Sequence, residues 1–131
     1  MDRAKIAALV LLGVLLAAGS AAAQSDALLE AYDHSKALFG EGRFADAIPF
    51  AEEALALGED EFGRDDVTTA TLLNNLAELH RAAGVYSEAE TLHRRALDIL
   101  NTRLTPQDVQ IAVSAHNLAE VYRAQERYAE A

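Results

Sequence analysis

Apolar residues recur at steps of three and four along much of the chain, which is the spacing of a helical face. The clearest stretch covers residues 72–83, where the recurring positions are Leu72, Leu73, Leu76, Ala77, Leu79, His80 and Ala83. Gly84 follows at a place where a helix commonly ends in a left-handed residue. The helical pattern then resumes from Tyr86 to Leu100. We therefore predict a helix, a turn and a second helix in this part of the chain.

The segments on either side show the same pattern. Upstream, helices are predicted over residues 28–39 and 44–57, joined through residues 40–42, and the acidic segment 59–66 is interpreted as a solvated linker. Strand-type alternation of Val, Ile and Thr is absent, and Ala, Leu, Glu and Arg favour helices. The fold class predicted from these observations is all-α.

Downstream, another helix is predicted to begin near Thr105. Its hydroxyl can cap the helix, Pro106 suits the first helical position, and Asp108 would complete a box with the cap.

The chain also repeats itself every 42 residues. The corresponding segments are NLAELH (75–80) and NLAEVY (117–122), and GRFADA (42–47), GVYSEA (84–89) and ERYAEA (126–131). A fixed period of this length is the signature of a repeat architecture. The copies are approximately residues 28–65, 66–104 and 105–131, of which the third is cut short, and together they form one repeat domain over residues 24–131.

The first 23 residues are interpreted as a secretory signal peptide. Arg3 and Lys5 precede an apolar run from Ile6 to Ala18, and Ala21 and Ala23 give the spacing of a cleavage site. The run is shorter than the roughly 20 residues that span a bilayer, although an uncleaved anchor stays an alternative. Cleavage after Ala23 predicts a periplasmic or secreted protein that leaves the membrane.

The repeated residues resemble the tetratricopeptide repeat, with its two antiparallel helices per unit. The positions that carry the resemblance are Ala31, His34, Ser35, Leu38, Ala47, Ala51 and Ala54; Leu73, Leu76, Ala77, His80, Ala89, His93 and Ala96; and Ala115, Leu118, Ala119, Tyr122 and Ala131. The 42-residue period is similar to the kinesin light chain-like subclass with extended helices. The resemblance implies tandem helical hairpins in a right-handed solenoid of about two and a half repeats, and a role in holding another protein or peptide. Trp and the closing proline of the family pattern are absent.

A polar stripe follows one face of the first helix in two of the copies. It consists of Asn74, Asn75, Glu78 and Arg81, and again of His116, Asn117, Glu120 and Arg123. Asn both donates and accepts hydrogen bonds, and the Arg fork recognises carboxylates, so the stripe is a candidate partner-binding groove on the concave face. The alternative is an exposed stripe in which Glu and Arg pair within each helix. The first copy has Tyr32, Asp33, Lys36 and Phe39 instead, so that end is expected to recognise something different or to act as a cap.

Composition and motifs argue against other classes of function. The formal net charge is −10, and −11 after loss of residues 1–23, which would repel nucleic acid and anionic lipid. There is no cysteine, and the four histidines lack metal-type spacing. His80 and His93 are interpreted as packed rings, and the acidic segment lacks the ligand pattern of a calcium loop. No catalytic, cofactor or metal site is predicted, and the chain is not expected to be an enzyme.

The third copy leaves two alternatives open. Its apolar face could be covered by self-association, which would give a homo-oligomer or scaffold joined through the C-terminal end. Alternatively, the chain could be the N-terminal part of a longer repeat protein with a downstream catalytic or effector domain. Both follow from the need of a repeat array for about three units and a cap.

Overall fold

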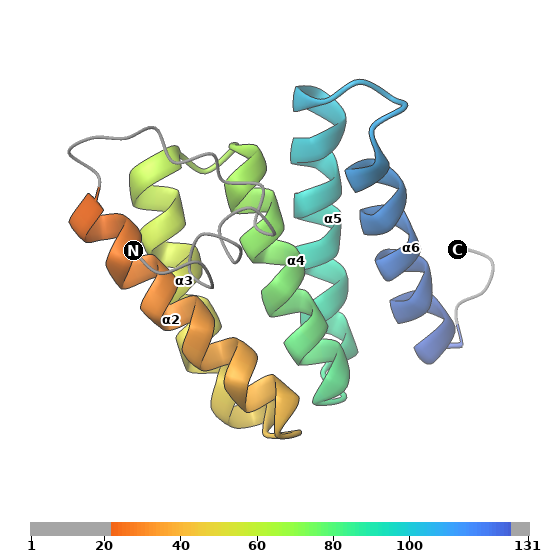
Figure 1. Cartoon of the computed structure of the whole chain (residues 1–131). Helices are drawn as coiled ribbons and strands as arrows, with labels where there is room; N and C mark the ends of the chain where they lie inside the picture. The colour runs from red at the N-terminus through yellow and green to blue at the C-terminus, as the bar shows by residue number, and fades with distance from the viewer. Residues whose placement is uncertain (1–21, 127–131) are drawn as a thin grey trace.

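The computed structural model describes residues 22–126, which form a row of helices (Figure 1). The helices are α2 (Ala22–Gly40), α3 (Phe44–Phe62), α4 (Val67–Ala82), α5 (Tyr86–Arg103) and α6 (Val109–Ala124). Residues 22–126 contain no strand, which confirms the all-α prediction. The predicted leader lies outside the described residues except for Ala22 and Ala23, and so does the ERYAEA segment except for Glu126.

The helices form two antiparallel hairpins and the first helix of a third. Helix α2 pairs with α3, α4 pairs with α5, and α6 packs against α5. Figure 1 shows α2, α4 and α6 in one layer and α3 and α5 in the other. This alternation confirms tandem helical hairpins of about two and a half repeats.

Left-handed residues terminate the first helix of each copy at intervals of 42. Gly42 and Gly84 have φ values of 75° and 83°, as predicted for Gly84. The turns are equivalent, because Arg43 N donates to Leu38 O at 2.9 Å and Val85 N donates to His80 O at 2.8 Å. At the same position of the third copy, Glu126 has a φ of 58°, which is costly for a residue with a Cβ atom.

Aspartates cap α4 and α6, also 42 residues apart. The Asp66 carboxylate accepts from Thr68 N at 2.8 Å, and that of Asp108 accepts from Gln110 N at 2.9 Å. The prediction of Thr105 as the cap is therefore wrong. Thr105 O instead accepts from Asp108 N at 2.9 Å, which places Pro106 in a turn ahead of the helix.

Most of the predicted acidic linker is helical. Helix α3 continues to Phe62, five residues beyond the predicted end, and the connection is confined to residues 63–66. Glu59 explains the extension, because its carboxylate contacts Arg95 at 2.9 Å and Arg64 at 3.3 Å. The helix ends at Gly63, where φ is 99°.

Small residues lie where the helices approach most closely, as the resemblance implied. Ala47, Ala77, Ala89 and Ala96 are fully buried and Ala54 is nearly so. Between them, larger side chains fill three apolar clusters, in which Leu28, Leu73 and Leu76 take part. Burial of this apolar surface is the main stabilising contribution, at about 25 cal/mol per Å².

Candidate binding surface

A cavity of about 260 Å³ lies between α2 and α4. Its lining comes from α2 (Tyr32, Ser35, Lys36 and Phe39) and from α4 (Asn75, Glu78 and Leu79). The structure thus brings part of the second-copy stripe together with residues that the first copy carries at the same register. The aromatic residues of the first copy form one wall of a pocket whose other wall is α4.

Asn75 contributes a buried polar atom to this pocket. Its side-chain nitrogen, Nδ2, is inaccessible to solvent and has no hydrogen-bond partner among the described residues. A buried donor without a partner costs about 1–3 kcal/mol, so nearly all such groups in folded proteins are satisfied. An unused donor in a cavity wall is therefore a candidate contact for a ligand.

The α2 wall is largely apolar and carries one cation. The Lys36 ammonium lies 5.7 Å from the centre of the Tyr32 ring. Burial, and secondarily the charge of Asp33, raise the pKa of the Tyr32 hydroxyl, which stays neutral at physiological pH. Ser35 does not offer its hydroxyl proton to the cavity, because that proton goes to Tyr32 O at 2.8 Å.

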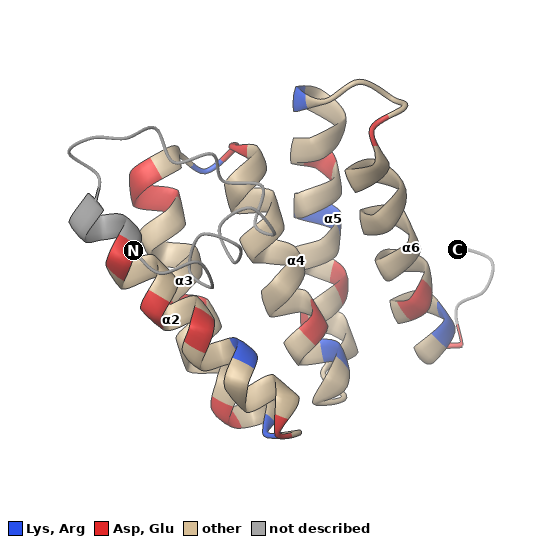
Figure 2. Cartoon of the chain, viewed as in Figure 1, with Lys and Arg blue, Asp and Glu red and all other residues tan. Residues whose placement is uncertain are grey.

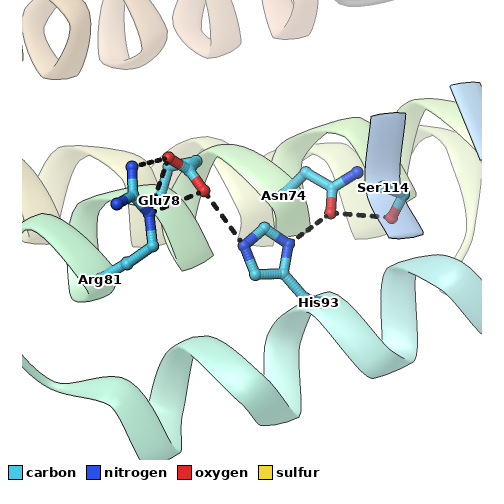
Figure 3. A network of polar contacts seen from close by, with 5 residues as sticks. All are labelled: Asn74, Glu78, Arg81, His93 and Ser114. Atoms are coloured by element: carbon cyan, nitrogen blue, oxygen red, sulfur yellow. Dashed lines mark hydrogen bonds and ion pairs between the residues drawn. The ribbon is translucent and has the colours of Figure 1, made fainter. Parts of the chain in front are cut away.

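Asn74 points away from the pocket and toward α5 and α6 (Figure 3). Its Oδ1 lies 2.9 Å from Nδ1 of His93 and accepts from the Ser114 hydroxyl at 3.3 Å. His93 is completely buried, which confirms it as a packed ring. Adjacent stripe residues thus differ, since Asn74 joins three helices internally whereas Asn75 faces the cavity.

Glu78 belongs to both the cavity wall and the buried network. One carboxylate oxygen lies 3.3 Å from His93 Nε2, and the other accepts from Arg81 Nη2 at 2.7 Å (Figure 3). Burial alone would raise the pKa of the Glu78 carboxyl, but the contacts with His93 and Arg81 outweigh it and lower that pKa to about 2. Glu78 is therefore charged at neutral pH, and its charge is balanced from within the fold.

The third-copy stripe residues lie on α6 and are more exposed. Glu120 Oε1 accepts from Arg123 Nη1 at 2.7 Å, as Glu78 does from Arg81, so Glu and Arg do pair within each helix. His116 is exposed and Asn117 is half-buried. Mainly the hydrogen bond from Glu78, with a further contribution from the charge of Glu120, raises the pKa of Arg81. The two copies of the stripe are thus electrostatic neighbours across the α4–α6 layer.

Other chemistry is sparse in the described part of the chain. Within residues 22–126, no three His, Asp or Glu side chains are arranged to hold a metal ion. None of the described helices has both the length and the apolar character needed to cross a bilayer. His80 is half-buried, and its Nδ1 is enclosed without a hydrogen bond. Acidic side chains occur on every helix rather than on a single face (Figure 2).

A family model described as tetratricopeptide repeat matches residues 27–102 and again 86–131. The chain belongs to the tetratricopeptide repeat family. A comparison with curated proteins found no match. Tetratricopeptide repeats typically serve as non-catalytic modules that mediate protein–protein interaction, and they bind protein partners.

The residues of the site that sequence reasoning missed are those whose role depends on a neighbouring helix. Ser35 and Leu79 line the pocket, and Ser114 completes the contact to Asn74, although no motif marks them. The 42-residue register of this tetratricopeptide repeat protein does contain one usable signal. Ser114 stands where the preceding copy has the buried Leu72, and a hydroxyl at an apolar position indicates a buried polar contact.

Proposed function

We propose that this tetratricopeptide repeat protein is an exported binding module that holds an extended peptide or protein segment on the face formed by α2, α4 and α6. The observation that carries the proposal is the pocket between α2 and α4, into which Asn75 presents an unused donor. A donor of this kind is satisfied by the backbone carbonyl of an extended chain. The long helices, of 16 to 19 residues, support the 42-residue kinesin light chain-like subclass.

The test uses the register. A library of random displayed peptides is selected on the wild-type protein, and the selected peptides are titrated against a variant that combines Asn75→Ala and Asn117→Ala. We expect the variant to keep its helical circular dichroism and to lose binding. Full retention of binding by the folded double variant would reject the concave face as the site. A variant carrying Thr91→Ala, at an exposed position of α5 in the other layer, is the matched control and should bind normally.

The export part of the proposal rests on the order of charge, apolar run and small residues in residues 1–23. Expression of the full chain in a bacterium with a periplasm, followed by fractionation and intact-mass measurement, tests it. The expected product is periplasmic and begins at Gln24. A cytoplasmic product that retains residues 1–23 would contradict export.

Self-association through α6 is a second candidate, and one specific observation favours it. Val109 and Val113 are 71% and 53% exposed, and Ala112 is exposed although its counterpart Ala70 is fully buried. The occupant would be a second copy of this chain. Sedimentation velocity over a hundredfold range of concentration is the measurement, and a constant monomer mass would dismiss the candidate.

A further inference from the structure

We infer that the pocket between α2 and α4 is a subsite for one apolar side chain of a bound peptide, and that Asn75 Nδ2 donates to a backbone carbonyl of the same segment. The inference rests on the proposed function and specifies which part of the face makes the decisive contact. It also commits to the chemistry of the occupant, which is an extended segment with a leucine-sized side chain and no basic residue beside it.

The size of the cavity limits what it can hold. Sites for whole small molecules usually have volumes of about 300–1,000 Å³, and this pocket has about 260 Å³. It therefore suits a single side chain with a short length of backbone. Tyr32 and Phe39 from one wall and Leu79 from the other supply the apolar contact surface, and Phe39 is 44% exposed, which leaves one side accessible.

The hydrogen-bonding groups around the cavity select an acceptor. Ser35 donates its hydroxyl proton to Tyr32 O, and Glu78 is held by Arg81 and His93. Asn75 Nδ2 is thus the buried donor of this lining that still lacks an acceptor. A peptide carbonyl satisfies it without bringing a charge into an apolar site, whereas a carboxylate would have to be desolvated beside Glu78.

Charge complementarity excludes a basic neighbour. Lys36 stands on the pocket wall over Tyr32, and among residues 22–126 no carboxylate forms an ion pair with it. Glu78, the nearest candidate to attract a cation on the opposite wall, already has Arg81 as its partner. A lysine or arginine next to the inserted side chain would be repelled by the Lys36 ammonium.

The experiment titrates capped tripeptides into the full chain and follows the backbone and side-chain amide signals by two-dimensional NMR. The probes are Ac-Gly-Leu-Gly-NH2, Ac-Gly-Ala-Gly-NH2 and Ac-Lys-Leu-Gly-NH2. We expect the leucine peptide to bind in the millimolar range and to shift the Asn75 side-chain amide. The alanine peptide should bind roughly tenfold or more weakly, because several methylene-sized groups of buried surface are lost. The lysine peptide should bind several-fold more weakly than the leucine peptide.

Two variants at one position and a register-matched control decide the role of Asn75. Asn75→Ala should weaken the leucine peptide roughly two- to tenfold, the range for one hydrogen bond. Asn75→Asp, which keeps the shape but removes the donor, should weaken it at least as much. Asn117→Ala, at the equivalent position of α6, should leave the affinity unchanged. Urea unfolding checks the fold, and Asn75→Ala should be no less stable than wild type because a buried unpaired donor is removed.

The outcomes separate the subsite from the proposed function. Equal affinity for the leucine and alanine peptides, or absence of any shift at Asn75, overturns the subsite. Library-selected peptides that tolerate both Asn75 variants but lose affinity in Asn117→Ala also overturn it, while the proposed function survives. Unchanged peptide affinity in the double variant overturns both.

Discussion

The Glu78 carboxylate should make the stability of this protein depend on acid in a way that a single substitution removes. The carboxyl has a folded-state pKa of about 2, compared with an ordinary value of 4.5. Because its pKa is depressed on folding, Glu78 stabilises the native state above pH 4.5, and this contribution is lost as the pH falls toward 2. Replacement of Glu78 by Gln eliminates this titration while keeping the side-chain size.

The magnitude follows from the difference between the two pKa values. One pKa unit corresponds to 1.36 kcal/mol, so the shift from 4.5 to about 2 is worth roughly 3 kcal/mol at pH 7. Near pH 3 about half of that contribution is left. The side chain is 28% exposed, so solvent screening makes 3 kcal/mol an upper figure.

The assay is urea unfolding followed by circular dichroism at pH 7, 5, 4 and 3 for wild type, Glu78→Gln and Glu120→Gln. Glu120 is the matched control, because it pairs with Arg123 on the more exposed α6 and has no histidine contact. The difference between wild type and Glu78→Gln should shrink from about 3 kcal/mol toward 1 kcal/mol as the pH falls, whereas Glu120→Gln should stay within about 1 kcal/mol throughout. A Glu78→Gln difference that is constant with pH would refute the reasoning.

Three further predictions concern the turns, the caps and the core. Glu126→Gly should raise the free energy of unfolding by about 1 kcal/mol by relieving the left-handed strain, and Gly84→Ala should lower it by a similar amount; urea midpoints decide, and equal midpoints for wild type and Glu126→Gly would contradict the strain. Asp66→Ala and Asp108→Ala should each cost about 1 kcal/mol in urea unfolding, whereas Thr105→Ala should be nearly neutral; a larger loss at Thr105 than at Asp108 would restore Thr105 as the cap. Leu73→Ala, at a fully buried position, should cost about 3–5 kcal/mol by thermal or urea unfolding, and Val109→Ala, at an exposed one, less than about 0.5 kcal/mol; comparable losses would argue against this core.

The parts of the fold that the sequence predicts well are those that depend on local chemistry repeated in register. Gly42 and Gly84 mark turns because a left-handed residue is needed at both, and the small residues at Ala47 and Ala89 mark close helix crossings because nothing larger fits. The cap of α6 was mistaken for a local reason, since Thr105, Pro106 and Asp108 fit two different helix starts equally well. The register would have decided the case, because Asp66 lies 42 residues before Asp108.

The remaining errors and omissions come from contacts between helices. The polar composition of residues 59–62 is typical of a linker, and the helix persists there because Glu59 finds Arg95 on α5, 36 residues away. Asn74 and Asn75 are indistinguishable as letters, although one packs against His93 and the other faces the cavity. Neighbouring helical residues point about 100° apart, so only the positions of the surrounding helices determine which of them is available.

The two seams of the array are built differently, and this has an evolutionary consequence. Between the second and third copies, Asn74, His93 and Ser114 join α4, α5 and α6 through polar contacts that require specific atoms. The first copy has Tyr32 and Ala51 at the positions of Asn74 and His93, and its seam with α4 contains the pocket. Substitutions on α2 can therefore change which peptide is preferred without altering the joint that keeps the other hairpins aligned. Specificity and rigidity are encoded at separate boundaries of the array, so each can drift while the other is preserved.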